Sequence, residues 1–347
     1  MAESRPSSLE QGLVQAWYAQ RSWIILLVPL SWLFRLVAKL RKIVLQALYQ
    51  GRHYQVPVTV IGNISLGGSG KTPLLIALVK ALSERGYRVA VISRGYGGSA
   101  VNYPLEVKEN TPAEECGDEP LLIKRKLAEY GCPVVVDPER RRAVDYIVDN
   151  CQCDLVISDD GLQHYRLHRD VEISVIDGSR GFGNGQCLPA GPLREPVSRL
   201  LDCDFVMING TYEWPNNWPV TYPFELKPVA FRHMMSGTTA QPDSWVLSKK
   251  VHAVAAIGNP QRFAASLESL GLEVILHAAN DHQHLTSDQL DFDDGLPVII
   301  TEKDAVKLAD TENDNLWVLD VDIDLPEEFV VQFLDNINQP PKNNPGI

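Results

Sequence analysis

A lysine and a threonine at positions 71 and 72 follow a glycine-rich turn, and their surroundings are typical of a phosphate-binding loop. The β-branched apolar run 58–61 predicts a buried parallel strand before the turn. The apolar run 74–82 predicts a helix after it. Backbone N–H groups of such a turn and the helix N-terminus favour a bound phosphate. We therefore expect Lys71 to reach the β- and γ-phosphates of a nucleotide and Thr72 to ligate Mg²⁺. The predicted nucleotide-binding residues are Ser65, Leu66, Gly67, Gly68, Ser69, Gly70, Lys71 and Thr72.

One position departs from the usual G-x-x-x-x-G-K-T pattern. Its first glycine would stand at position 65, where this chain has Ser65. Gly67 and Gly68 could supply the missing backbone freedom. The alternative interpretation is a glycine-rich turn before an ordinary helix. The strand and helix that flank the turn favour the phosphate-binding loop.

Two adjacent aspartates, Asp159 and Asp160, follow the apolar strand predicted at 154–158. A strand that ends in aspartate is what a Walker B element requires, because its carboxylate must meet the Mg²⁺ held by the loop threonine. Either aspartate alone could be a turn or cap residue. Further along, Arg194 is a candidate phosphate ligand, and Glu195 could orient it or assist the metal.

The elements that must position these residues predict an α/β fold with a mostly parallel sheet, as in P-loop NTPases. Strands are expected at 86–93, 132–137, 154–158, 171–177 and 204–209. Loop 94–98 follows a strand at its carboxyl end, where sites of α/β sheets form. The arginines at 140–142 are expected to open a solvated helix, although one of them could reach an anion.

The chain divides by pattern into five segments. Residues 1–55 form an apolar and basic N-terminal segment, 56–220 the nucleotide-binding domain, 221–250 an extended linker, 251–337 a smaller α/β domain and 338–347 a polar tail. In the smaller domain, a loop histidine next to Asp281 could close onto the phosphate-binding site.

Charge is distributed unevenly along the chain. The formal net charge is −12, which argues against a nucleic-acid partner. Residues 1–55 nevertheless carry a net charge of +5. Apolar residues at roughly helical spacing with Lys and Arg between them describe an interfacial helix, so we expect contact with a membrane surface. A buried helix of the soluble core is the alternative, and the pattern does not decide whether the helix spans the membrane or lies on it.

The cysteines add little to this picture. Six are present without zinc-binding spacing, and Cys151 and Cys153 favour a structural role. No pattern calls for disulfides, which fits a reducing cytoplasm.

Six segments spread along the chain form a joint pattern: S-L-G-G-S-G-K-T-P (65–73), S-R-G-Y-G-G (93–98), G-D-E-P (117–120), D-D-G-L-Q-H (159–164), L-P-A-G-P-L-R-E-P (188–196) and T-E-K-D-A-V-K (301–307). Together they resemble the motifs of the tetraacyldisaccharide 4′-kinases, the lipid A 4′-kinases of Gram-negative bacteria. The resemblance extends over nearly the whole chain.

The resemblance implies a kinase that moves the γ-phosphoryl group of ATP, with Mg²⁺, onto the 4′-hydroxyl of a lipid disaccharide 1-phosphate. It implies a location at the cytoplasmic face of the bacterial inner membrane. It also implies that Asp118 is the catalytic base and that His282 tunes it. By the same motifs, Glu119 joins the metal ligands, and Tyr96 joins Arg194 and Glu195 as substrate contacts.

Two other classes of protein remain open from the residues alone. A membrane-associated P-loop GTPase or NTPase that acts as a switch or delivery protein would share the loop and the aspartate pair. It would need a guanine-reading Asn/Thr-Lys-x-Asp, and the segment 301–304 (T-E-K-D) misses that pattern by one inserted glutamate. A non-enzymatic membrane scaffold would have no need for Lys71.

Overall fold

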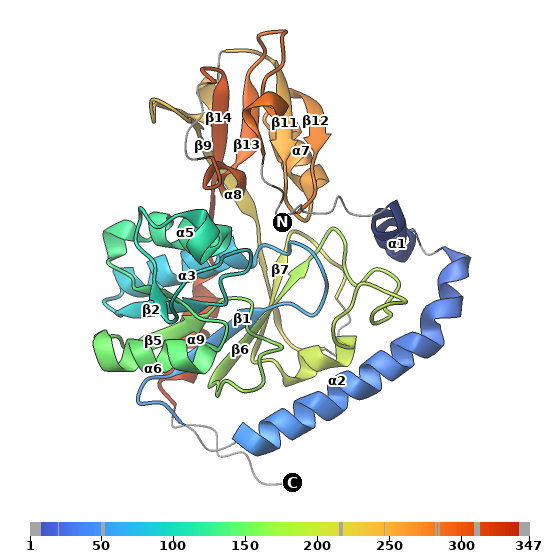
Figure 1. Cartoon of the computed structure of the whole chain (residues 1–347), viewed down its shortest axis with the longest axis vertical. Coiled ribbons are helices and arrows are strands. Elements are labelled where there is room, and N and C mark those ends of the chain that lie inside the picture. The colour runs from blue at the N-terminus through green and yellow to red at the C-terminus, as the bar shows by residue number, and fades with distance from the viewer. Residues whose placement is uncertain are drawn as a thin grey trace.

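The computed structural model describes residues 8–19, 21–49, 53–214, 218–245, 247–281, 283, 285–308 and 313–339. It contains two α/β bodies stacked one above the other, with a long helix beside the lower one (Figure 1). We call the body around the first sheet the first domain and the body around the second sheet the second domain. His282, His284 and residues 340–347 lie outside the described residues.

The first sheet has the strand order β3-β4-β2-β5-β1-β6-β7-β8. All neighbouring strands are parallel except β3 and β4. This arrangement confirms the predicted mostly parallel sheet. The strands are β1 (Val58–Gly62), β2 (Val89–Ser93), β3 (Leu105–Glu106), β4 (Val134–Val136), β5 (Leu155–Ser158), β6 (Val171–Asp177), β7 (Phe205–Asn209) and β8 (Thr221–Phe224).

Both faces of this sheet are covered, which explains why its strands are continuously apolar. Alternate residues of one strand enter different cores: Ile61 packs in the core that contains α3, and Val60 packs in the core that contains α6. The covering helices are α3 (Lys71–Glu84), α4 (Ala113–Cys116), α5 (Asp118–Lys126), α6 (Arg140–Asn150) and the short 3₁₀ helices η2 (Ala128–Tyr130) and η3 (Val197–Asp202).

The second sheet has the order β10-β9-β14-β13-β11-β12. The strands from β14 to β12 are parallel, and β9 and β10 add an antiparallel edge. The strands are β9 (Leu226–His233), β10 (Thr239–Ala240), β11 (Lys250–Ala255), β12 (Glu273–Ala278), β13 (Val298–Thr301) and β14 (Leu316–Ile323). The helical elements are η4 (Pro242–Ser244), α7 (Pro260–Ser269), η5 (Ser287–Gln289) and α8 (Glu302–Ala305).

Two segments tie the domains together. The segment 221–250, predicted as an extended linker, supplies β8 to the first sheet and then β9 and β10 to the second. Helix α9 (Glu327–Ile337) falls within the range predicted for the second domain but packs in the core of the first. Its Phe329 lies edge-on to Phe205 of β7, with ring centroids 5.2 Å apart. The chain therefore crosses between the two sheets and returns.

The N-terminal segment forms α1 (Ser8–Tyr18), η1 (Ser22–Leu27) and α2 (Val28–Tyr49). Helix α2 runs along one side of the first domain (Figure 1). Its Ser31 hydroxyl donates to the carbonyl of Cys187 (2.8 Å), and Lys42 Nζ lies 3.0 Å from Asp202 Oδ2. The stretch Ser22–Tyr49 is the one described helical stretch long and apolar enough to cross a membrane, by length and composition only. In its most apolar window, only 11% of the residues are buried, so the alternative of a buried core helix is wrong.

Candidate active site

The glycine-rich loop begins after β1 and ends where Lys71 opens α3. Gly67 and Gly70 have φ angles of +96° and +93°, which glycine adopts most readily. Beside the loop, the Asn209 side chain donates to the carbonyl of Ser69 (3.1 Å). A Cβ at Gly70 would come within 2.5 Å of Asn209 Nδ2. The loop is thus shaped both by its glycines and by a side chain from the end of β7.

The structure gives a reason for the serine at position 65. Ser65 pairs with Leu193 in an antiparallel bridge, and its φ angle is not positive. A paired, extended residue needs no glycine. The backbone freedom that the usual pattern places here is provided two residues later, at Gly67.

Three predicted residues converge at the end of this loop. Lys71 Nζ lies 3.5 Å from Asp160 Oδ1, and Arg194 Nη1 lies 3.3 Å from Asp160 Oδ2. Asp160 has a φ angle of 44°, a strained conformation for a non-glycine residue. The two cations and the aspartate come from three separate segments, so the fold has brought them together around one carboxylate.

Arg140 is a functional candidate that sequence reasoning missed. The arginines 140–142 were expected to be solvated, although one of them could reach an anion; solvation is wrong for Arg140, because it is buried. Its guanidinium donates to the carbonyls of Asp159 (2.7 Å) and Asp160 (2.9 Å). It therefore fixes the backbone that carries both carboxylates. The sequence offered only its position at the start of a helix after a strand, and the contact with the loop after β5 is a property of the fold.

The two aspartates differ in their electrostatics. Burial raises the pKa of Asp159 to about 7, and the nearby carboxylates of Glu119 and Asp160 add to the effect. Burial would also raise the pKa of Asp160, but Lys71, Arg194 and Arg140 outweigh it and lower the pKa to about 2. Asp160 is thus the carboxylate that cations neutralise, whereas at Asp159 burial outweighs the lowering effect of Lys71 and Arg140.

The oxygen atoms at this point fit a hard divalent cation. Among the described residues, neither carboxylate oxygen of the buried Asp159 has a hydrogen-bond partner. Buried polar atoms are rarely left unpaired without a reason. Carboxylate and hydroxyl oxygens are the ligands that Mg²⁺ prefers, and Thr72 is the second residue of α3.

Glu195 lies behind the site rather than in it. Its carboxylate is buried, accepts from Gln163 Nε2 (2.9 Å) and accepts from the Tyr165 hydroxyl. Gln163 Oε1 in turn accepts from Arg194 Nη1 (3.4 Å). Glu195 therefore acts on Arg194 through Gln163. Glu195 was predicted to orient Arg194, to assist the metal or to contact the substrate, and this geometry fits the orientation of Arg194 best.

The second domain contributes lysines that face the first-domain acids. Lys303 Nζ lies 3.0 Å from Glu119 Oε1, and Lys307 Nζ lies 3.6 Å from Asp118 Oδ2. Lys303 also lies 3.5 Å from Asp281 Oδ1. Burial would lower the pKa of Lys303, but the carboxylates of Glu119 and Asp281 outweigh burial and raise it. Sequence reasoning gave these lysines no role, although their spacing within the motif 301–307 was visible.

The remaining predicted residues are placed as follows. His282 lies outside the described residues, so its pairing with Asp118 stays a prediction. The preceding residue, Asp281, pairs with Lys303, which also pairs with Glu119. Glu119 directly follows Asp118 in the chain. The side chain of Tyr96 is exposed, and its carbonyl lies against Gly117, the residue before Asp118.

The two domains meet at the loop itself. A Cβ on Gly258 would come within 2.3 Å of the backbone nitrogen of Gly68. Nearby, Asn259 Nδ2 donates to Asp177 Oδ2 (3.0 Å), and Arg262 donates to Asp177 Oδ1. Second-domain backbone therefore touches the phosphate-binding loop, and polar side chains at the start of α7 hold this contact.

Comparison with known proteins decides the family. The sequence model of LpxK, described as tetraacyldisaccharide-1-P 4′-kinase, matches residues 23–338. The chain belongs to this family. Among its relatives, the tetraacyldisaccharide 4′-kinase of Alcanivorax borkumensis is 46% identical over 330 residues, which cover 94% of this chain and 98% of that protein. The one from Hahella chejuensis is 43% identical, covering 94% of this chain and 96% of that protein.

A solved structure supports the same assignment. The crystal structure of LpxK from Aquifex aeolicus in complex with ATP superimposes with a TM-score of 0.73 and 25% sequence identity. The match covers 91% of this chain and 99% of that one. Family and fold confirm the predicted ATP-dependent kinase. They do not favour the GTPase-switch alternative, and they exclude the non-enzymatic scaffold.

Proposed function

We propose that this chain transfers the γ-phosphoryl group of ATP to the 4′-hydroxyl of a tetraacyldisaccharide 1-phosphate, a lipid A precursor. The observation that carries the proposal is the convergence of Lys71, Asp160 and Arg194 at the end of the phosphate-binding loop in a member of this family. The names of the relatives and the ATP complex of the Aquifex protein support the nucleotide and the acceptor.

On the nucleotide side, the loop 65–70 and the N-terminus of α3 surround the phosphates with backbone N–H groups. Lys71 and Arg194 balance the charge of the transferred group. In the structure both pair with Asp160, which holds them at the loop. Phosphoryl transfer is accelerated chiefly by positioning and charge neutralisation, which is what these two cations supply.

Asp159, Asp160 and Thr72 would hold Mg²⁺, with Glu119 as a further ligand. When bound, this ion would neutralise negative charge on the phosphates. The unpaired oxygens of Asp159 are the support for the assignment. Glu119 pairs here with Lys303, so to act as a ligand it would have to leave that lysine.

On the acceptor side, Asp118 accepts the proton of the 4′-hydroxyl. Its carboxylate lies at the first turn of α5, opposite Lys307 of the second domain. His282 remains the proposed partner that takes up the charge of the proton. The residue after it, Gln283, accepts through its backbone carbonyl from Lys307 Nζ (3.2 Å). Because groups from both domains meet here, closure of the domains assembles the site, and opening releases the lipid product.

Helix α2 is proposed to lie in the membrane interface on the cytoplasmic face of the bacterial inner membrane. It contacts the first domain from Ser31 to Lys42, a length of about 16 Å at 1.5 Å per residue. A helix bound along its side to a folded domain cannot enter the bilayer without it. Its exposed apolar residues face away from that contact: Leu30, Trp32, Leu33, Leu36, Val37, Leu40, Ile43, Val44 and Leu48.

The function is tested with purified full-length protein, labelled ATP or GTP, and detergent-dispersed tetraacyldisaccharide 1-phosphate. We expect transfer of label from ATP to the lipid, with little transfer from GTP. Nucleotide hydrolysis that is independent of the lipid, without labelled lipid, would contradict the proposal. A lipid that is labelled but keeps a free 4′-hydroxyl would overturn the assigned position.

A further inference from the structure

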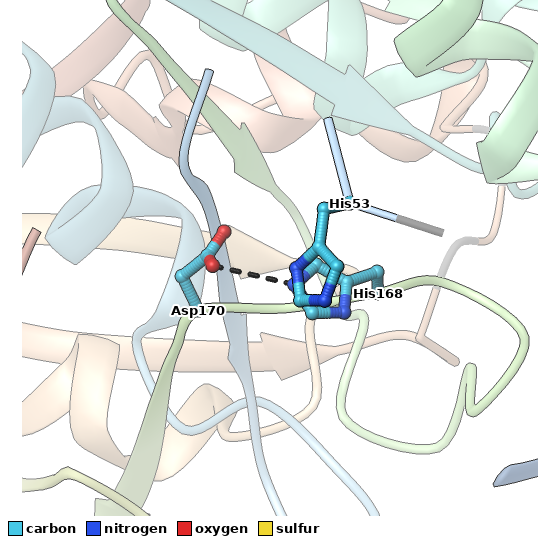
Figure 2. Close-up of side chains that lie close together, drawn as sticks. All are labelled: His53, His168 and Asp170. Carbon is cyan, nitrogen blue, oxygen red and sulfur yellow. Dashed lines mark hydrogen bonds and ion pairs between the residues drawn. The ribbon is translucent and has the colours of Figure 1, made fainter. Parts of the chain in front are cut away.

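Two histidines and an aspartate gather at the end of the first sheet that is remote from the phosphate-binding loop. They are His53, before β1, and His168 and Asp170, before β6 (Figure 2). Their candidate ligand atoms all lie within 4.8 Å of one another. The two imidazole rings meet edge-on with centroids 4.3 Å apart, and Asp170 faces His168.

We propose that His53, His168 and Asp170 bind a single divalent transition-metal ion, with Zn²⁺ as the best-fitting ion, which fixes the segment between α2 and β1 to the start of β6. Two imidazoles and one carboxylate form a ligand set that zinc sites commonly use. Imidazole ligands disfavour Mg²⁺ and Ca²⁺, which prefer all-oxygen sites. The site is therefore chemically distinct from the carboxylate pair at the loop.

The geometry needs little adjustment to take the ion. Ligands of a tetrahedral zinc ion with bonds of about 2.0–2.1 Å lie about 3.4 Å apart. His168 Nε2 already lies 3.3 Å from Asp170 Oδ1. The remaining ligand, His53, is exposed, so its ring can approach the other two without displacing a core residue. A fourth position stays open to water.

Asp170 is held in a ligand-ready orientation by the sheet. Its Oδ2 accepts from the N–H of Val58 (2.8 Å), and its own N–H donates to the Val58 carbonyl (2.8 Å). These bonds leave Oδ1 directed at His168. Hydrogen bonds that orient a ligating carboxylate in this way are a regular feature of metal sites.

The position of the cluster suggests what the ion does. His53 follows Tyr49, the last residue of α2, by four positions. The Tyr49 ring is covered by Arg141 and Arg166, at 4.9 Å and 5.7 Å, and Arg166 belongs to the same loop as His168. One loop therefore meets both the end of α2 and His53. A metal ion there links the membrane-facing helix to the rigid sheet.

The site is not part of the phosphoryl-transfer machinery. It lies at the amino ends of β1 and β6, whereas the phosphate-binding loop follows the carboxyl end of β1. Five residues of strand separate the two by about 16 Å. Loss of the ion should therefore change the anchoring of α2 and the thermal stability, but not turnover of a detergent-dispersed substrate.

The test uses full-length protein that has been dialysed against a chelator, and Zn²⁺ binding is measured by competition with a chromophoric chelator. His53→Gln and His168→Gln are compared with wild type and with His233→Gln, a histidine of β9 outside the cluster. We expect one Zn²⁺ equivalent in the wild type and the His233 variant. In both cluster variants its affinity should fall by at least tenfold, since even residues that merely support a ligand cost about 10- to 100-fold.

Co²⁺ absorption and thermal unfolding supply readouts that do not depend on activity. Co²⁺ should give visible bands of a low-coordinate nitrogen and oxygen site in the wild type, and the bands should be lost in His53→Gln. Zn²⁺ should raise the Tm of the wild type more than that of His53→Gln, because only an ion bound to the folded state stabilises it. His53 is exposed, so the metal-free variant should unfold at the same temperature as metal-free wild type.

Two outcomes would overturn the proposal. One is equal Zn²⁺ affinity and equal Tm shifts in wild type, His53→Gln and His168→Gln. The other is the absence of any Zn²⁺ equivalent in the wild type. Neither outcome would touch the kinase assignment, which rests on transfer of label to the lipid.

Discussion

The candidate active site has a first-domain side and a second-domain side, and the two hold their charges in different ways. On the first-domain side, Lys71 from the start of α3 and Arg194 from the loop before η3 converge on Asp160. On the second-domain side, Lys303 and Lys307 reach their partners across the domain boundary. The first arrangement lies within one domain, whereas the second depends on how the two domains meet.

The first-domain side therefore serves to bind the phosphates, and the second-domain side serves to assemble the complete site. A phosphate site must be rigid, because catalytic charge stabilisation depends on groups that need no reorganisation. A site for a bulky lipid must open and close. Ion pairs that cross the domain boundary suit this purpose, because separation of the domains would expose both partners to water. We infer that the cross-domain lysines control access, and that Lys71 and Arg194 act on the transferred group.

The largest effect is expected for Lys71→Ala, which removes a positive charge from the first-domain side of the site. Loss of a comparable transition-state cation costs about 10³- to 10⁵-fold in kcat. Circular dichroism and thermal unfolding should show an intact fold. The matched control is Lys80→Ala on the same helix, whose partner Asp322 is half exposed, and it should keep near-normal turnover. Normal turnover in Lys71→Ala would refute the phosphate-binding role.

Asp118→Asn tests the residue at which the two sides meet. Removal of a general base costs about 10²- to 10⁴-fold, and the loss should appear in kcat far more than in nucleotide affinity. If His282 belongs to the same catalytic unit, the double variant with His282→Ala should be little worse than Asp118→Asn alone. Fully multiplicative losses would instead indicate separate roles for the two residues.

Lys307→Met tests the second-domain side through stability. The side chains of Lys307 and Asp304 are fully buried, with their charged atoms 3.1 Å apart. Removing one partner of a buried pair costs about 3–5 kcal/mol, because the remaining charge stays buried. Denaturant unfolding measures this loss. The control Lys227→Met breaks an exposed pair with Asp324 and should cost at most about 1 kcal/mol. Equal losses in the two variants would contradict the structure.

The smallest effect on chemistry is expected from α2, which belongs to neither side of the site. Changing Leu33, Leu36 and Leu40 to Glu places charges on its exposed apolar face. Vesicle binding should fall by at least about tenfold, because each leucine loses apolar burial in the interface. The KM for lipid should rise while kcat in detergent stays constant. Leu247→Glu, an exposed leucine of the second domain, is the control and should leave vesicle binding unchanged.

Salt extraction tests whether α2 lies in the membrane interface or spans the membrane. Peripheral binding that rests partly on Lys and Arg should weaken at high ionic strength, because salt screens exposed charges. A spanning helix would stay in the membrane fraction. Retention of the wild-type chain after high-salt and alkaline washes would therefore contradict the proposal that α2 lies in the interface.

Local sequence was sufficient for the parts of the site that are themselves local. Contiguous residues encode each of three elements: the strand before the glycine-rich turn, the helix that begins at Lys71 and the strand before Asp159. Hydrophobic period and glycine placement determine such elements over short distances. The charge and apolar pattern of the N-terminal segment likewise predicted an exposed amphipathic helix. The family resemblance supplied the reaction.

Only the tertiary structure decided which distant residues meet. Ser65 is explained by its pairing with Leu193, and Arg140 is buried because α6 opens against the loop after β5. The return of α9 to the first sheet follows from the aromatic core around Phe205. No local pattern contains these contacts, because side-chain partners are set by how whole elements pack.

The same limit applies to the lysines of the motif 301–307 and to the metal cluster proposed at His53. As a sequence, that motif is the end of a strand followed by a short polar helix, and nothing in it identifies Glu119 or Asp118 as partners. His53 and His168 lie in different segments with no shared spacing. They become neighbours because β1 and β6 are adjacent parallel strands, and their amino ends therefore lie side by side. Strand order in a sheet is a property of the whole chain, and this order decides which functional residues meet at each end of the strands.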